Sequence, residues 1–269
     1  MEKMNNLILV PTDFSEVCNN ATQQAAKAAQ FFGYKLVLLH VLDKNSPSEQ
    51  EASTKLTDLT SDLAKQYSID TSFEVEKGDI FEVIPDRAKE LGANLMFLGT
   101  HGKVGMQKLT GSFALKVITA SPCPVIVTQK RPFENGYQKI VLPITSDAGP
   151  VDKTKWAIFL AKNFNAEVHI VHPERDDLIG VIRMLTQNLA LAEVKYVVHP
   201  TKSSDFTEET LEIAASVDAD LIMIMTKPKE GVKDFFFGRY DEEIIFNKAQ
   251  IPVMCTNPRP YNWEKIFEF

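Results

Sequence analysis

A glycine-rich segment, residues 98–113, carries the clearest chemical signal in the sequence. Four glycines fall within thirteen residues, and a serine follows the last of them where a helix is predicted to begin: Gly99, Gly102, Gly105, Gly111 and Ser112. Glycines let backbone N–H groups approach an anion closely, and a helix N-terminus adds a favourable dipole. The segment therefore predicts a phosphate cradle, with a flexible linking loop as the alternative. It is neither a Walker A loop nor a Gly-x-Gly-x-x-Gly dinucleotide fingerprint.

Polar side chains near predicted strand ends are the other candidates for chemistry. Asp13 directly follows the first strand, where a carboxylate can accept hydrogen bonds from a sugar or bind a metal. The alternative is an aspartate that caps a helix or forms a turn. His101 has no identifiable Asp or Cys partner for acid–base work, so contact with phosphate or solvent is favoured. His40 and His172 occupy matched positions and predict a packing role common to both halves. We therefore predict no catalytic residue and no metal site.

The chain is an internal repeat. Four pairs of segments recur in the same order at shifts of 126 to 132 residues: 6–11 with 139–143, 35–40 with 167–172, 93–98 with 219–224, and 122–127 with 251–255. Such self-similarity is typical of a duplicated structural unit. We predict one unit over residues 1–131 and a second over 139–257, joined where Pro132 and Gly136 punctuate the chain. Residues 258–269 form an aromatic C-terminal tail, which is predicted to dock on the protein or on another chain.

Each unit is predicted to alternate strands and helices. The repeated segments are short, apolar and rich in Val, Ile and Leu, as in parallel strands that are buried on both faces. Amphipathic stretches between them predict helices over Ser15–Phe32, Glu49–Tyr67, Phe81–Leu91, Asp152–Phe164, Leu178–Leu191, Phe206–Val217 and Asp241–Ala249. The fold class is therefore α/β, with two tandem open parallel five-stranded sheets flanked by helices. Ligands of such sheets bind beyond the carboxyl ends of the strands, where the strand order reverses.

Composition excludes several classes of protein. The net charge is −7, divided as −2 over residues 1–135 and −5 over 136–269, and no Lys/Arg cluster stands out. Nucleic acid is therefore not expected as a partner. Three scattered cysteines are too few for a disulfide framework or a metal site and predict reduced thiols. No apolar stretch approaches the ~20 residues needed to span a bilayer, so we expect a cytoplasmic protein without a membrane partner.

Several motifs resemble those of the universal stress protein family. They are Val10-Pro-Thr-Asp13, the pair His40-Val41, Leu98-Gly-Thr-His-Gly102, Gly111-Ser112 and Cys123-Pro-Val125. Because the resemblance covers both halves, it implies a tandem member with a Rossmann-like, adenine nucleotide alpha hydrolase-like fold. Nucleotide-binding members of the family carry Gly-2x-Gly-9x-Gly-Ser/Thr. Here eight residues, not nine, separate Gly102 from Gly111, which shortens the loop between ribose and phosphates.

The resemblance implies a site for ATP, possibly with Mg²⁺, in the first unit. Pro11, Thr12 and Asp13 would lie along the adenosine, with Asp13 near the ribose hydroxyls. The backbone of Val41 would face the adenine edge. The glycines and the start of the following helix would approach the ribose and phosphates through Gly99, Gly102, Gly111, Ser112 and Phe113.

The second unit departs from this pattern. Thr145 stands in place of Asp13, Pro173 in place of Val41, and Met225 and Pro228 in place of Gly99 and Gly102. Arg239 replaces Ser112, although Gly238 persists. Loss of the carboxylate and of the bare backbone predicts that this unit binds no nucleotide in the family's manner.

The favoured function is that of a non-enzymatic stress protein that binds ATP in its first unit as a regulatory or sensing ligand, with little or no hydrolysis. One alternative is an interaction protein that binds no nucleotide, which the short glycine spacing favours. The other is a slow ATP hydrolase, for which only Lys103 and Lys108 lie in the loop to neutralise charge. The resemblance further implies that the units pair through their last strands, Pro124–Thr128 and Ile251–Thr256, as an intramolecular pseudo-dimer. A homodimer and a protein client remain open.

Overall fold

The computed structural model describes residues 5–42, 48–100, 111–133, 135–145, 150–228, 235–236 and 239–257. The first unit contains five strands and four helices in strict alternation. They are β1 (Leu7–Pro11), α1 (Glu16–Phe32), β2 (Lys35–Leu42), α2 (Glu49–Tyr67), β3 (Thr71–Lys77), α3 (Ile80–Glu90), β4 (Leu95–Gly99), α4 (Gly111–Ala120) and β5 (Val125–Thr128). The predicted helix over Glu49–Tyr67 has these bounds in the structure, and the others agree within a residue or two. The caps explain α1: Ser15 accepts from the N–H of Cys18, and Gly33 ends the helix with a left-handed φ of 66°.

The second unit repeats this order with additions. Its elements are β6 (Lys139–Pro143), α5 (Pro150–Phe164), β7 (Glu167–Pro173), the short 3₁₀ helix η1 (Asp176–Leu178), α6 (Ile179–Leu191), β8 (Tyr196–Thr201), α7 (Phe206–Ser216), β9 (Leu221–Met225), β10 (Lys227–Pro228), β11 (Phe235–Phe236), α8 (Arg239–Ile245) and β12 (Val253–Thr256). The sequence-based bound for α8 was wrong, since the helix stops four residues before Ala249. The side chain of Asn247 explains this, because it donates to the carbonyls of Ile244 and Ile251 and so ends the helix.

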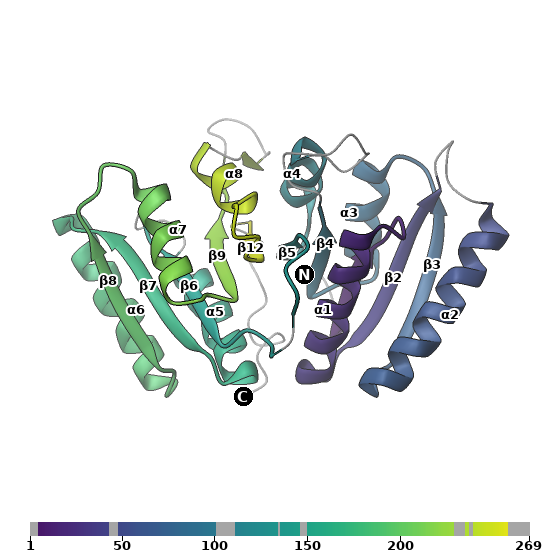
Figure 1. Cartoon of the computed structure of the whole chain (residues 1–269), viewed down its shortest axis with the longest axis horizontal. Coiled ribbons are helices and arrows are strands. Elements are labelled where there is room, and N and C mark those ends of the chain that lie inside the picture. The colour runs from purple at the N-terminus through teal and green to yellow at the C-terminus, as the bar shows by residue number, and fades with distance from the viewer. Residues whose placement is uncertain are drawn as a thin grey trace.

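The two five-stranded sheets are continuous with one another. The strand order is β3-β2-β1-β4-β5-β12-β9-β6-β7-β8. In this ten-stranded sheet the pairs within each unit are parallel, whereas β5 and β12 pair antiparallel, with Ile126 opposite Met254. Figure 1 shows these two strands in the middle of the molecule, with β3 and β8 at its outer ends. The strands that join are the last of each unit, as the resemblance implied.

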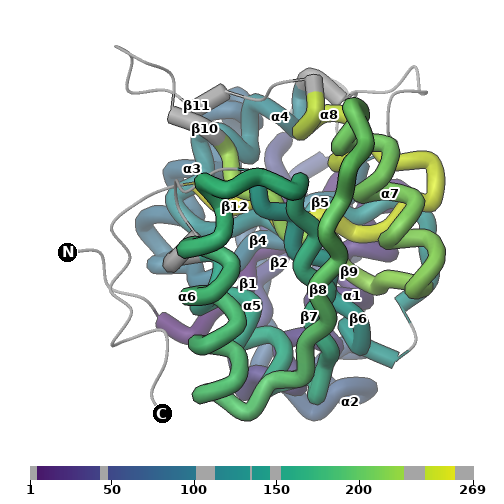
Figure 2. The backbone as a smooth tube through the Cα atoms, turned by 90° about the vertical axis from the view of Figure 1, so that its left-hand side faces the viewer, coloured from purple at the N-terminus to yellow at the C-terminus, as the bar shows by residue number. Residues whose placement is uncertain are grey.

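Helices cover both faces of this sheet. Buried side chains of α1, α2, α5 and α6 share one hydrophobic cluster, and those of α3, α4, α7 and α8 share the other. Strand residues alternate between the clusters: Ile8 and Val10 face the first, and Leu7 and Leu9 the second. Figure 2 shows the second unit from its outer edge, with α5 and α6 on one side of β7 and β8 and α7 on the other.

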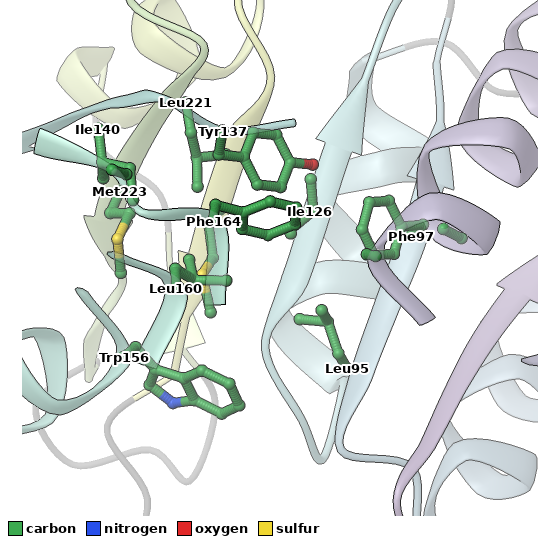
Figure 3. Packing of buried hydrophobic residues seen from close by; sticks show 14 of the residues in the cluster. Leu95, Phe97, Ile126, Tyr137, Ile140, Trp156, Leu160, Phe164, Leu221 and Met223 are labelled. Carbon is green, nitrogen blue, oxygen red and sulfur yellow. The ribbon is translucent and has the colours of Figure 1, made fainter. Parts of the chain in front are cut away.

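An aromatic seam fills the space between the two units on the side of α1 and α5. We use this name for Phe32, Phe133, Tyr137, Phe159 and Phe164, whose rings lie 4.8 to 6.5 Å apart in successive pairs. Figure 3 shows two of them, Tyr137 and Phe164, beside Ile126 of the first unit. The segment between the units therefore contributes to the core that it connects. Gly136 is required there, because its φ is +78° and an added Cβ would lie 2.7 Å from the ring of Phe164.

We expect the first unit, expressed alone as residues 1–131, to form a dimer or to aggregate. Without β12, β5 becomes an exposed apolar edge strand, and such edges pair with other chains unless they are covered. Size-exclusion chromatography with light scattering measures the outcome, with the full chain as the control. A stable, soluble monomer of 1–131 would show that the pairing of β5 with β12 is dispensable.

Candidate functional site

The strand order reverses between β1 and β4. From β1 the chain crosses to β2 and β3 on one side, and it returns to β4 and β5 on the other. Loops that leave β1 and β4 therefore diverge, and the space between them is the usual ligand position in an open α/β sheet. Pro11, Thr12, Asp13 and Gly99 all lie at this switch point, at or just beyond the ends of β1 and β4.

Asp13 is exposed and holds the loop between β1 and α1. Its Oδ1 accepts a hydrogen bond of 2.9 Å from the N–H of Ser15, the residue that caps α1. Partial desolvation raises the pKa of Asp13, but hydrogen bonds from Ser15 and Cys18 outweigh it and hold this pKa below its ordinary value. The carboxylate is therefore charged at neutral pH. The prediction that Asp13 forms a turn is confirmed, since one of its carboxylate oxygens accepts the hydrogen bond that stabilises the turn.

The turn after Asp13 is strained and packed in place. Phe14 has a left-handed φ of 64°, an unusual conformation for a bulky residue. Its ring centroid lies 4.7 Å from that of His40, and the Nζ of Lys55 lies 5.5 Å from its centre. His40 is buried, and its Nδ1 donates a 2.7 Å hydrogen bond to the carbonyl of Thr12. Neighbouring elements thus hold the backbone of the loop in one conformation.

The two matched histidines differ in their hydrogen-bond partners. His172 is less buried than His40, and its Nδ1 lies 3.0 Å from the carbonyl of its own neighbour, Pro173. His40 packs against the ring of Phe14, and in the sequence Ser146 stands at the position that matches Phe14. A packing role common to both histidines stays a prediction. The support of Thr12 by His40 is a feature that the sequence analysis missed.

The backbone of Val41 points toward the switch point. The carbonyl of Leu39 accepts from the N–H of Thr12 at 2.8 Å, so the backbone groups of Leu39 face β1. Alternate residues of a parallel strand direct their backbone groups to the same side, so those of Val41 also face the side of β1. Because β1 ends at Pro11, they face the space beyond its end. Pro173 occupies this position in the second unit and has no N–H to donate.

Gly99 is needed for a contact inside the protein. A Cβ at this position would lie 2.5 Å from the carbonyl oxygen of Val17 and 2.7 Å from the N of Cys18. The first turn of α1 therefore rests directly on the end of β4. The resemblance assigned this glycine to the ribose and phosphates, but close helix–strand packing alone accounts for it. The pairing of β4 with β5 extends one residue further, because the N–H of Thr100 donates to the carbonyl of Thr128 at 2.9 Å.

Helix α4 begins at Gly111, as the cradle requires. The first N–H groups of a helix, here those of Gly111, Ser112 and Phe113, have no partner within it. The ring of Phe113 stacks on Phe81 of α3 with 5.3 Å between centroids, which fixes the helix against its neighbour. Gly102, Gly105, His101, Lys103 and Lys108 lie outside the described residues, so the path of the loop itself stays a prediction.

The second unit has a different structure after β9. The chain forms the antiparallel pair β10 and β11, in which Pro228 is opposite Phe235. After β6, Thr145 stands at the position that matches Asp13, so the carboxylate is missing there. Arg239 is the first residue of α8. Gly238 lies outside the described part of the chain.

Other features of the described residues point to no second chemistry. Nowhere in this part of the chain do three His, Cys, Asp or Glu side chains gather as a metal site would require. Cys18, Cys123 and Cys255 are buried free thiols, and burial, followed by the charge of Asp13, raises the pKa of Cys18 to about 12. Among the described helices, none has the length and apolar character needed to cross a bilayer. A groove of about 1050 Å³ lies between α7 and residues 246–250, away from the switch point.

The fold and the switch-point site define a tandem α/β protein of the open, doubly wound type. The model of the universal stress protein family matches the chain twice, over residues 4–129 and 136–257. The chain therefore belongs to the universal stress protein family and carries one copy of its domain in each half.

Individual relatives agree with this assignment. A universal stress protein of Synechocystis is 31% identical over 135 residues, which cover 46% of this chain and 85% of the relative. Among solved structures, a universal stress protein of Archaeoglobus fulgidus superposes with a TM-score of 0.79 at 17% identity, covering 95% of this chain and 99% of that one. A putative universal stress protein of Pseudomonas aeruginosa gives a TM-score of 0.66 at 17% identity, covering 94% and 93%. At such identities the structures show a shared fold.

We expect Gly99→Ala to destabilise the protein by about 1–3 kcal/mol, because the new methyl group overlaps the backbone of α1. The control is Gly180→Ala on α6, where an added Cβ meets nothing within 4 Å. This change is expected to be neutral or stabilising by up to about 1 kcal/mol, as for glycine in a helix. Urea denaturation measures both. Equal stability of the two variants would contradict the tight contact of α1 with β4.

Proposed function

We propose that the first unit binds one ATP as a regulatory or sensing ligand in a stress response, with little or no hydrolysis, and that the second unit is its structural partner. The observation that carries the proposal is that three kinds of group lie at or after the carboxyl ends of β1, β2 and β4. These are the charged carboxylate of Asp13, the backbone groups of Val41 and the N-terminus of α4. They match the hydroxyl, base-edge and phosphate groups of a nucleotide.

Each group has a definite task in this proposal. Asp13 keeps oxygen lone pairs for ribose hydroxyls while Oδ1 holds the turn. The N–H and C=O of Val41 supply a donor and an acceptor for the edge of a purine. The first N–H groups of α4 bind phosphate oxygens, aided by the helix dipole. Mg²⁺ would be held chiefly by the phosphates and water, as is usual for this ion.

Binding asks less of the site than hydrolysis does. Phosphoryl transfer needs a positioned water or acceptor and cationic stabilisation of the transferred group. The loop lysines, Lys103 and Lys108, lie outside the described residues, and Asp13 is engaged in a turn on the ribose side.

The three cysteines are buried free thiols, in keeping with the reducing environment of the cytoplasm, where we place the protein.

We expect titration calorimetry to return one ATP site per chain. Asp13→Asn keeps an oxygen for the N–H of Ser15 but removes the charge. A hydrogen bond to a charged group contributes about 1.5–3 kcal/mol, so Kd is expected to rise about tenfold or more. Thr145→Ala at the matched position of the second unit is the control and should leave Kd unchanged. Two equivalent sites per chain, or an unaltered Kd in Asp13→Asn, would contradict the assignment to the first unit.

Turnover tests the non-enzymatic part of the proposal separately. With Mg²⁺ and saturating ATP, we expect phosphate release far below the median enzyme kcat of about 10 s⁻¹. A rate near that value that is lost in Asp13→Ala would identify an ATP hydrolase instead.

One observation favours a second candidate, an interaction protein that binds no nucleotide. Only eight residues separate Gly102 from Gly111, one fewer than in the nucleotide-binding pattern. Chromatography of the denatured, freshly purified protein distinguishes the two. A protein that contains no nucleotide and also ignores added ATP would support the second candidate.

A further inference from the structure

The outer edge of the second unit is apolar. Strand β8 is the last strand of the ten-stranded sheet, and no other strand of the described residues pairs with its free side. Figure 2 looks onto this edge, with β8 and α6 toward the viewer. Of the five large apolar side chains that the described residues expose, four lie on these two elements: Ile179, Leu191, Tyr196 and Val197. Exposed apolar side chains that gather on one edge indicate an interaction surface.

The matched edge of the first unit is charged instead. Strand β3 is the last strand on that side and carries Glu74 and Glu76, which form ion pairs with Arg87 at 2.7 and 3.8 Å. Such charges keep an edge strand from pairing with another chain. By the register with the neighbouring strands, β8 has His199 and Thr201 at these two positions. The protection that β3 carries is thus missing from β8.

The free side of β8 presents unpaired backbone groups. Toward β7, the carbonyls of Lys195 and Thr201 accept hydrogen bonds of 2.9 Å. Alternate residues of a parallel strand direct their backbone groups to the same side, so the N–H and C=O groups of Tyr196 and Val198 face away from β7. Pro200 is also at an outward position and has no N–H, as is typical of a proline in an edge strand.

One register of antiparallel pairing between two copies of β8 satisfies the outward groups of Tyr196 and Val198. It places Tyr196 of one copy opposite Val198 of the other, so that each residue donates and accepts one backbone hydrogen bond. Pro200 then lies opposite Val194, whose N–H already donates to the carbonyl of Leu189 at 2.9 Å. The ladder therefore ends there without leaving an N–H unpaired.

The side chains of β8 are self-complementary in the same register. Val197, which is 38% exposed, lies opposite Val197 of the second copy, in a non-hydrogen-bonded pair whose side chains are close together. On the other face of the sheet, Tyr196 lies opposite Val198, and pairs of an aromatic with a β-branched residue stabilise sheets. The exposed apolar side chains of the strand thus cover one another.

Charges at the two ends of β8 are complementary as well. Glu193 precedes the strand and Lys202 follows it, and both are exposed. The antiparallel copy brings each Lys202 opposite the residue next to Glu193, whereas its present contact with Glu174, at 3.5 Å, is an exposed ion pair of little weight. Lys195 lies opposite His199, but burial lowers the pKa of His199, so this histidine is mainly neutral at pH 7.

We propose that β8 binds a second copy of this chain, edge to edge and antiparallel, with Val197 on the two-fold axis. A two-fold interface requires a surface that complements itself, and the backbone groups, side chains and end charges of β8 all do so. The two ten-stranded sheets then continue through the pair of β8 strands. Within one chain, β5 and β12 already join two sheets in this antiparallel manner.

Light scattering after size-exclusion chromatography, at chain concentrations up to about 100 µM, tests the proposal. We expect a mass twice that of the 30.2 kDa chain. Val197→Lys puts two ammonium groups opposite one another on the axis and is expected to raise the Kd of the dimer about 100-fold or more. Ser72→Lys, at the matched position of β3, is the control and should leave the dimer intact.

A wild-type chain that is monomeric at this concentration would overturn the proposal and leave the edge to a strand of a different protein. A dimer that survives Val197→Lys, or that is lost in Ser72→Lys alone, would place the interface elsewhere. Circular dichroism checks that both variants stay folded, which the exposure of Val197 favours.

Disulfide trapping tests the register without introducing a charge. Val197→Cys is expected to cross-link two copies on mild oxidation, because partners in a non-hydrogen-bonded pair have Cα atoms about 4.5 Å apart, within the range of disulfides. Tyr196→Cys and the control Ser72→Cys are expected to cross-link at least tenfold more slowly, since neither residue lies opposite its own copy. The three native cysteines are buried, so the background is low.

Equal rates for Val197→Cys and Ser72→Cys would overturn the contact through β8. Faster cross-linking of Tyr196→Cys than of Val197→Cys would overturn the proposed register. ATP takes no part in these measurements, so their outcome is independent of the proposed function.

Discussion

The antiparallel pairing of β5 with β12 is the interaction on which the rest of the molecule depends. It joins two parallel sheets into one and brings the ends of α4 and α8 within reach of side chains from the opposite unit, Asn257 and Gln129. It also brings α1 beside α5, where the aromatic seam forms. Both five-stranded sheets would otherwise end in an apolar edge. The duplication therefore solves a problem of exposed backbone, because each copy covers the edge of the other.

Once this scaffold is shared, the two copies need not share chemistry. The first keeps a charged carboxylate after β1, the backbone of Val41 at the end of β2 and a glycine at the start of α4. The second has a threonine, a proline and a short strand pair at the matched positions. These differences lie outside the buried parts of the strands, which are apolar in both halves. Loops at the carboxyl ends of strands can diverge freely for this reason, while the core keeps its composition.

Much of the fold was readable in the sequence, because local signals and burial agree. Apolar runs mark the strands, and Ser15 with Gly33 bounds α1. The site was predictable only in part. Gly99 reads as a ligand contact in a motif, yet the contact that requires it is with Val17, which only folding brings near. The support of Thr12 by His40 depends on a hydrogen bond between residues 28 positions apart. The early end of α8 depends on side-chain hydrogen bonds of Asn247, and neither feature leaves a periodic signal.

The seating of α1 on Gly99 has a mechanical consequence. A helix of 17 residues is a stiff rod of about 25 Å. One of its ends carries the cap and turn of Asp13 and presses on the end of β4, and the other ends in Phe32 within the seam. The turn of Asp13 and the aromatic seam are therefore the two ends of one stiff element, which fixes the distance between them. The close approach at Gly99, a residue without a side chain, sets where this element rests on β4.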